Sequence, residues 1–272
     1  MAGTLFICAT PIGNLGDVTD RLGEVLRTVD VVYAEDTRRT STLLRHLDSD
    51  RPLRSYFVGN EAFRSAEVAG RLADGENVAL VTDAGMPAVA DPGVSAIAAA
   101  REVGATVTVV PGPSAVTSAI GLSGFGGDRF VFEGFLPRKG ADRAERIGSI
   151  VADTRPTVIF CSPKRVIDDL SDLMAGAVPE RQVCVCREIT KQFEEIWVGS
   201  LSDAIDHWES NQPRGEFTVV ISPAPSPVEL SLAEAIESAR ALVVEGMSKS
   251  EAAKRAARQS SFSKGDIYDA LV

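Results

Sequence analysis

The chain has no excess of positive charge. Its 272 residues include 28 lysines and arginines against 38 aspartates and glutamates, which gives a formal net charge of −10. Proteins that attract nucleic acid through a general electrostatic field normally carry a basic domain, so this balance excludes a generic nucleic-acid binder. With 44% hydrophobic and 24% charged residues, the composition is that of a globular protein and excludes the disordered and fibrous classes.

Long hydrophobic runs are also missing. No stretch approaches the roughly eighteen uncharged apolar residues that a membrane-spanning helix needs. The first residues contain a short apolar stretch, but no basic residues precede it as they would in a secretory signal. We therefore expect a cytoplasmic protein without a membrane partner.

Cysteine and histidine are scarce and scattered. The four cysteines, at positions 8, 161, 184 and 186, contain no C-x-x-C pair, and we expect buried, reduced thiols. The two histidines, His46 and His207, each lie in a predicted helix, where we expect surface or boundary positions. Neither a G-x-S-x-G motif nor a G-x-x-x-x-G-K-[ST] phosphate loop is present. Hydrolase, P-loop and metal chemistry are therefore disfavoured, and we expect no metal.

Strand-like and helix-like patterns alternate along the chain, which predicts the α/β class. Strands are expected at residues 4–8, 31–34, 78–82, 106–110, 130–133, 157–161, 183–187, 194–198 and 217–221. Helices are expected at residues 18–29, 41–47, 62–73, 92–104, 115–122, 143–151, 166–174, 201–209, 230–244, 250–258 and 265–271. Asp91, followed by a proline, is expected to cap its helix. The first half should form a mostly parallel sheet and the second a mixed one.

Two proline-rich segments punctuate this pattern. The first is Pro111-Gly112-Pro113, and the second, at residues 222–227, should form an extended linker. We therefore predict an N-terminal α/β domain at residues 1–112, a second α/β domain at 113–224, and a linker with a small helical module at 225–272.

Glycine and proline gather in three turns that directly follow predicted strands, at residues 9–17, 82–87 and 110–115. Ligands bind at the carboxyl ends of strands in open α/β sheets, and glycine lets the backbone approach them closely. Acidic residues stand at similar places, because Glu35 and Asp36 follow the second strand and Asp83 ends the third. A carboxylate such as Asp83 either caps its turn or binds a polar ligand group, and the sequence leaves both open.

Basic residues are few but clustered, at residues 38–45, 138–146, 164–165 and 249–264. A solvated helix face explains any one cluster. Four clusters on an acidic protein favour a polyanionic partner that is bound locally.

Seven motifs, in order, resemble the tetrapyrrole methylase-like class III methyltransferases, in particular those that methylate ribosomal RNA. They are ATPIGNLGD at 9–17, AEDTR at 34–38, TDAGMPAVADPG at 82–93, VVPGPSAVTSAIGLSG at 109–124, FEGFLPRK at 132–139, REITKQFEE at 187–195 and GEFTVVI at 215–221. The resemblance implies two α/β domains with S-adenosylmethionine in the cleft between them, and a homodimer. It also implies methylation of a cytidine ribose 2′-hydroxyl in the decoding region of 16S rRNA. Because the protein is acidic and has only local basic clusters, we expect it to recognise a preformed shape such as the assembled small subunit.

The resemblance also assigns residues. It implies cofactor contacts at Pro11, Gly13, Asp83, Gly85, Met86, Val89, Ala90, Asp91, Ser114, Ala115, Phe160, Cys161, Gly215, Glu216 and Phe217. Substrate-facing residues would be Arg38, Arg138, Lys139, Arg143 and Lys191. Residues 55–61 and 161–165 lack the histidines usual in the family, so a histidine base is excluded at both places.

Methyl transfer from a sulfonium needs the attacking oxygen to be aligned with the methyl group and water to be excluded. A ribose hydroxyl is a poor nucleophile, so a base, or a cation that stabilises the developing alkoxide, should assist its attack. The catalytic candidates are Glu35, Asp36, Arg38, Lys139 and Lys191. A simple ion pair between Asp36 and Arg38 is an equally good explanation of those two residues. Other functions stay open: a tetrapyrrole carbon methylase, a non-enzymatic RNA-binding factor, and a nicotinamide oxidoreductase.

Overall fold

The computed structural model describes residues 1–225, 231–244, 246–258, 260 and 262–271. Contacts divide the chain into two compact units, Met1–Ser222 and Pro223–Val272. Residues 226–230 of the predicted linker lie outside the described part, and the predicted domain boundary at residue 112 stays a prediction. Among the described residues, no helix has the length and apolar character needed to cross a membrane.

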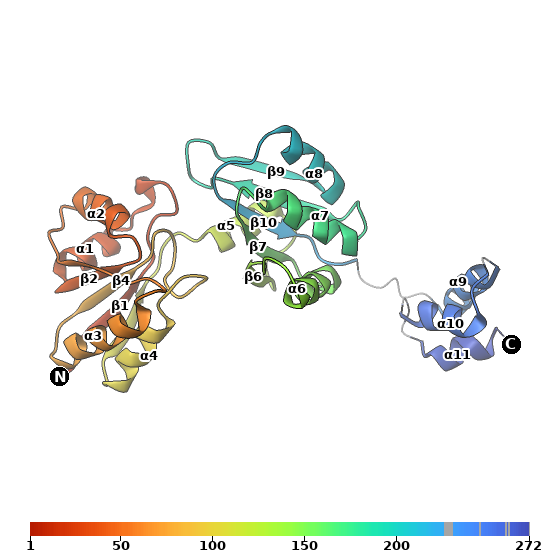
Figure 1. Cartoon of the computed structure of the whole chain (residues 1–272), viewed down its shortest axis with the longest axis horizontal. Coiled ribbons are helices and arrows are strands. Elements are labelled where there is room, and N and C mark those ends of the chain that lie inside the picture. Colours follow the sequence, from red (N-terminus) through yellow and green to blue (C-terminus); the bar gives the residue numbers. More distant parts are fainter. Residues whose placement is uncertain (226–230, 245, 259, 261, 272) are drawn as a thin grey trace. The chain divides into compact units, whose positions relative to one another are not determined.

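The first sheet of the larger unit is entirely parallel (Figure 1). Its strands are β1 (Thr4–Cys8), β2 (Val31–Ala34), β3 (Leu53–Ser55), β4 (Val78–Val81) and β5 (Thr106–Val110). They lie in the order β3-β2-β4-β1-β5. The carboxyl ends of all five strands therefore meet at one edge of the sheet, where α/β proteins bind ligands.

Helices cover both faces of this sheet, because its central strands are apolar on both sides. The helices are α1 (Asp20–Thr28), α2 (Thr37–His46), α3 (Glu61–Ala73) and α4 (Val94–Glu102), with a 3-10 turn at Leu15–Asp17. The helices α1 and α2 pack on the face that carries Cys8 and Val32, while α3 and α4 pack on the face that carries Leu5 and Tyr33.

The second sheet is mixed, in the order β6-β7-β10-β8-β9, and its β6/β7 pair is parallel while the other pairs are antiparallel. Its strands are β6 (Val131–Phe135), β7 (Thr157–Cys161), β8 (Gln182–Arg187), β9 (Glu195–Ser200) and β10 (Phe217–Ile221). The helices around it are α5 (Ala115–Ser123), α6 (Ala141–Ala152), α7 (Val166–Gly176) and α8 (Leu201–Ser210). The last three pack on one face and α5 packs on the other (Figure 1).

In the part that the structure describes, the smaller unit contains three helices, α9 (Leu232–Val244), α10 (Lys249–Arg258) and α11 (Lys264–Asp269). Its core is built mainly from alanines, with Ile267 as a larger side chain. Ser263 and Asp266 form a capping box at the start of α11, which satisfies backbone N–H groups there. Small core residues let the short helices pack closely.

The predicted α/β class is confirmed, and most strands lie where the pattern placed them. The expected cap at Asp91 is wrong, because α4 begins at Val94 after Gly93, whose φ of 145° suits only glycine. The helix α2 begins earlier than expected, at Thr37, since the Asp36 side chain accepts a hydrogen bond from the Arg38 backbone N–H. The short edge strand β3 was not expected. All four cysteines are free and buried, as predicted.

Candidate active site

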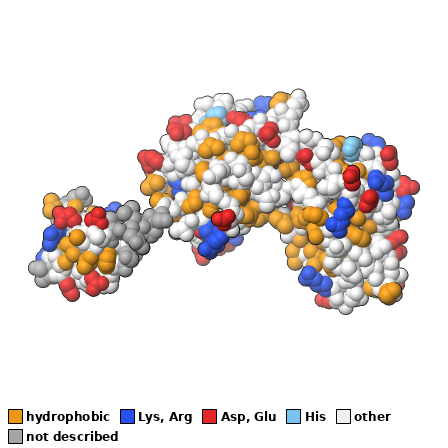
Figure 2. Space-filling view, turned by 180° about the vertical axis from the view of Figure 1, so that it is seen from behind, with side chains coloured by type: hydrophobic (Ala, Val, Ile, Leu, Met, Phe, Trp, Pro, Cys, Tyr) orange, Lys and Arg blue, Asp and Glu red, His pale blue; other side chains and the backbone are white. Residues whose placement is uncertain are grey.

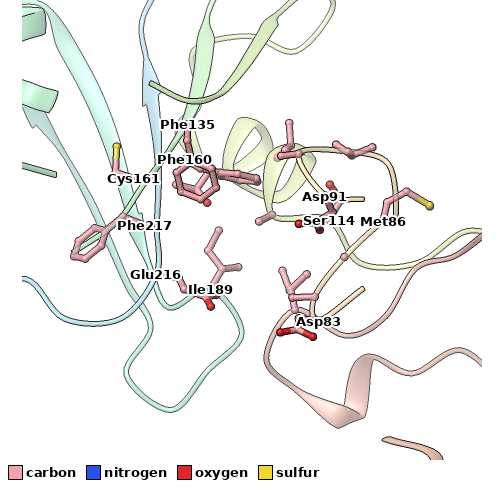
Figure 3. A pocket seen from close by; sticks show the side chains of 18 of the residues that line it. Asp83, Met86, Asp91, Ser114, Phe135, Phe160, Cys161, Ile189, Glu216 and Phe217 are labelled. Carbon is pink, nitrogen blue, oxygen red and sulfur yellow. The ribbon is translucent and has the colours of Figure 1, made fainter. Parts of the chain in front are cut away.

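A cleft of about 390 Å³ lies within the larger unit (Figure 3). One side is formed by turns that follow β1, β2, β4 and β5, and the other by residues of the second sheet and its loops. The volume falls in the range of small-molecule sites. The cleft therefore occupies the sheet edge at which the sequence placed its glycine- and proline-rich turns.

Three of the carboxylates that line this cleft, those of Glu35, Asp83 and Asp91, belong to the turns that follow β2 and β4. Burial, followed by the charge of Asp83, raises the pKa of Glu35 above its usual value. Burial, followed by the charges of Glu35 and Asp83, raises the pKa of Asp91 to about 6. Arg39 forms an ion pair with Asp83 at 3.3 Å. Because these negatively charged groups are held close together, this end of the cleft favours a positively charged ligand group.

The loop at residues 83–93 carries unusual backbone conformations beside these carboxylates. Ala88 and Ala90 have φ values of 66° and 60°, in the left-handed region that costs alanine about 1–2 kcal/mol per residue. The loop is fixed by reciprocal backbone hydrogen bonds between Thr10 and Gly85, of 2.9 and 3.1 Å. At its other end, the Gly93 backbone N–H donates to the Glu61 carboxylate at 3.2 Å. Strain of this kind is typical of ligand sites.

Lys191 lies at one edge of the cleft and forms two ion pairs. Its Nζ lies 2.8 Å from Glu188 Oε1 and 2.9 Å from Glu216 Oε2. Burial acts to lower the pKa of Lys191, but the hydrogen bonds to these two carboxylates outweigh it and raise the pKa. The side chain crosses Gly13, where an added Cβ would lie 2.9 Å from Lys191 Cε. Lys191 is therefore a cation held in place, and because its pKa is raised it stays protonated and does not accept a proton.

The structure brings together most of the residues that the sequence assigned to the site. The predicted residues that line the cleft are Glu35, Asp83, Gly85, Met86, Val89, Ala90, Asp91, Ser114, Ala115, Phe160, Cys161, Lys191, Glu216 and Phe217. Those outside its lining are Pro11, Gly13, Asp36, Arg38, Arg138, Lys139, Arg143 and Gly215. Their roles in binding and catalysis stay predictions.

Two of these residues are engaged with each other. Arg38 pairs with Asp36 at 2.7 Å, and this hydrogen-bonded pairing holds the pKa of Asp36 well below its usual range. The ion pair that the sequence left open between them is therefore present.

The expectation that Arg143 faces the substrate is wrong. Its side chain is buried, and its guanidinium contacts Asp169 at 2.8 Å and Asp172 at 2.6 Å. The partners lie on α7, so no local pattern could have identified them. Sequence reasoning also missed Arg39, Phe135 and Ile189, which line the cleft. The signal available for Phe135 was an aromatic residue shortly before the basic pair Arg138-Lys139.

Comparison with known proteins places this chain in a family. The family profile described as Tetrapyrrole (Corrin/Porphyrin) Methylases matches residues 4–205. A protein of Synechocystis sp. named Ribosomal RNA small subunit methyltransferase I is 39% identical over 271 residues, covering 98% of this chain and 96% of that protein. A protein of Thermotoga maritima with the same name is 44% identical over 220 residues, covering 81% of this chain and 98% of that protein.

Solved structures show a similar fold. The cobalt precorrin-4 methyltransferase CbiF superposes with a TM-score of 0.63 at 17% identity, covering 80% of this chain and 94% of that chain. Uroporphyrin-III-C-methyltransferase from Thermus thermophilus superposes with a TM-score of 0.56 at 20% identity, again over 80% of this chain and 94% of that chain. These likenesses concern the fold alone.

Proposed function

Because the chain belongs to the tetrapyrrole (corrin/porphyrin) methylase family, we propose that it is a methyltransferase acting on the RNA of the small ribosomal subunit. The observation that carries this proposal is the similarity to the Synechocystis protein over nearly the whole chain, the helical unit included. Similarity of that extent favours a shared substrate class more strongly than the fold alone does.

Methylases of this family take their methyl group from S-adenosylmethionine. The donor set of the cleft fits this cofactor, because Asp83 and Asp91 would complement its sulfonium and amino charges. Apolar side chains such as Met86 and Ile189 would contact its less polar parts, and the turn at Ser114 would offer backbone groups. When bound, the cofactor supplies an electrophilic methyl group.

We further propose that the acceptor is the ribose 2′-hydroxyl of a cytidine in the decoding region of 16S rRNA. A hydroxyl must lose its proton as it attacks, so a proton acceptor beside it would assist the reaction. Glu35 is our candidate for this role, because it lines the cleft and burial raises its pKa above the usual value of a glutamate. Arg38 and Lys139 are exposed and would serve the RNA backbone instead.

The charge distribution favours recognition of a preformed RNA shape. Basic and acidic side chains lie interspersed on the face drawn in Figure 2. In the helical unit, Lys254 and Arg255 are exposed on α10 beside an alanine core. An acidic protein with local basic groups should bind random RNA weakly, so we propose the assembled small subunit as substrate. On the family resemblance alone, we also propose a homodimer as the active form.

The decisive experiment maps ribose methylation in 16S rRNA from cells with and without the gene, and repeats it with purified protein and small subunits. We expect one 2′-O-methylcytidine to depend on the protein. The E35Q variant should lose at least tenfold in turnover at unchanged cofactor affinity, whereas E24Q, on the exposed side of α1, should behave as wild type. Complete 16S rRNA methylation without the protein would refute the proposal.

The fold likeness to corrin methylases makes a tetrapyrrole carbon methylase the second candidate. That activity would have no use for the basic residues of the helical unit. Replacing Lys254 and Arg255 by glutamine should lower methylation of small subunits, and equal activity of this variant on a tetrapyrrole substrate would favour the second candidate.

A further inference from the structure

The strand β6 contains a bulge where it enters the cleft. Phe132 lies opposite Val158 of β7 and Gly134 lies opposite the next residue, Ile159, so Glu133 is an extra residue in β6. Gly134 has a φ of 63°, a conformation that glycine adopts at little cost. Bulges of this kind redirect side chains and are frequent beside active sites.

The bulge decides which way Phe135 points. After it, Phe135 lies opposite Phe160, so both side chains are on the α5 side of the sheet together with Phe132. If β6 paired regularly through Glu133, with no bulge, Phe135 would lie opposite Cys161 and would point toward the core under α6 and α7. The ring centroids of Phe135 and Phe160 are 5.5 Å apart, and both rings lie at the cleft in Figure 3.

This orientation leaves a large aromatic side chain in contact with solvent. Phe135 is 59% exposed although it lines the cleft. Phe160 supports one part of its ring, and the rest is open to a ligand. An exposed aromatic ring in a binding cleft is the usual platform on which proteins stack unpaired nucleic-acid bases.

The loop that follows Phe135 is held in place by buried charges. Arg143 donates to the carbonyl oxygen of Pro137 at 2.9 Å, and Arg165 donates to the carbonyl oxygen of Arg138 at 3.3 Å. Asp169, itself buried, pairs with both arginines. The side chains of Arg138 and Lys139 are exposed on this fixed loop, three and four residues after Phe135. A stacking ring and two cations are therefore presented together.

We propose that Phe135 stacks on the base of the nucleotide to be methylated, while Arg138 and Lys139 contact the phosphates beside it. The proposal rests on the proposed function and adds to it that the target base leaves its stack in the RNA and is held on the protein. The shared chemistry of an aromatic base also fits the adenine of the cofactor, and the experiment separates the two.

The first test measures methylation kinetics on small subunits together with cofactor affinity by calorimetry. Stacking of one base predicts that F135A lowers kcat/KM for the subunit about tenfold to a hundredfold, with an unchanged Kd for the cofactor. F135W, which keeps an aromatic face, should stay within about threefold of wild type. The control is F63A, at a phenylalanine of α3 that is 72% exposed and does not line the cleft. Wild-type kinetics of F135A, or a weakened cofactor Kd, would overturn the proposal.

The second test asks whether the ring meets the target base itself. Small subunits are reconstituted from 16S rRNA and from the same RNA with an abasic ribose at the target position. If Phe135 stacks on that base, F135A should lower the rate on intact subunits and have little further effect on abasic ones. Equal losses on both substrates would show a merely structural role and overturn the inference. If wild-type protein methylates neither substrate, the proposed function itself has failed.

Discussion

The backbone N–H of Asp36 donates to Oδ1 of Asp83 at 2.9 Å. This hydrogen bond joins the residues that follow β2 and β4, so the two neighbouring strand ends share one carboxylate. Asp83 also forms an ion pair with Arg39 and lines the cleft. One side chain thus fixes the local backbone and contributes negative charge to the site.

Two substitutions at Asp83 should separate these contributions. D83N keeps an oxygen that accepts the hydrogen bond from the Asp36 N–H, so we expect nearly unchanged stability. We expect the cofactor to bind about tenfold more weakly, because D83N removes a negative charge that attracts the positively charged cofactor. D83A leaves that N–H without its partner and should also lower the free energy of unfolding by about 1–3 kcal/mol. Urea unfolding and calorimetric titration measure the two effects. Equal cofactor affinity of D83N and wild type would contradict the electrostatic assignment.

Cofactor binding should weaken below about pH 6. The pKa of Asp91 in the folded protein is raised to about 6, so the carboxyl is protonated below that value and loses its attraction for a cation. Titrations from pH 5 to pH 8 should show affinity rising through pH 6, and D91N should flatten the curve, while D142N, at an exposed position of α6, should keep it.

The raised pKa of Asp91 also predicts how the stability of the ligand-free protein changes with pH. Between the unfolded value of 3.8 and about 6, the folded state holds a proton that the unfolded chain has released. The contribution of Asp91 to stability is therefore fully present below pH 3.8 and is lost as the pH rises through about 6. Urea unfolding of D91N should show a weaker decline over this window than wild type does.

Removing Asp169 should destabilise the protein far more than removing Asp172. The carboxylate of Asp169 is buried against Arg143 and is 4% exposed, whereas that of Asp172 is 51% exposed. Breaking a buried pair leaves an uncompensated charge, so D169A should cost about 3 kcal/mol in the free energy of unfolding and D172A about 1 kcal/mol or less. Denaturant unfolding measures both variants, and similar losses would argue against the buried network.

A methyl group at Gly13 should displace Lys191. The added Cβ of G13A would overlap the Lys191 side chain and separate its Nζ from Glu188 and Glu216. We expect a loss of about 1–3 kcal/mol in stability. The double variant G13A/K191A should lose less than the sum of the single variants, because the clash is gone. The control G148A lies on α6, where an added Cβ has open space, and should not destabilise. Additive losses would show that the two residues act separately.

Sequence patterns were sufficient for features that depend on neighbouring residues. The strands Thr4–Cys8 and Thr106–Val110 are continuous apolar or β-branched runs, and both were predicted with their observed bounds. The turns after these strands were placed at the cleft for the same reason, since they carry local glycine and proline signals. The edge strand Leu53–Ser55 was missed because three residues give no period to recognise.

Features that depend on distant partners were not predictable in this way. The local sequence around Arg143 is that of a surface arginine. Its burial depends on ion pairs with Asp169 and Asp172, which lie on α7. The orientation of Phe135 depends on an extra residue in β6, which appears only when β6 is paired with β7. Local composition therefore located the site, while pairing between segments decided which side chains enter it.

The order of strands in the first sheet has a consequence for how the chain folds. β1 is made first, yet it lies between β4 and β5, whose last residue is Val110. During synthesis β1 stays without neighbours until those strands emerge, so early nucleation at the N-terminus is disfavoured and folding should be slow for a chain of this size. The edge of this sheet that lines the cleft therefore forms only after β5 has been made, and no fragment ending before Val110 is expected to form it.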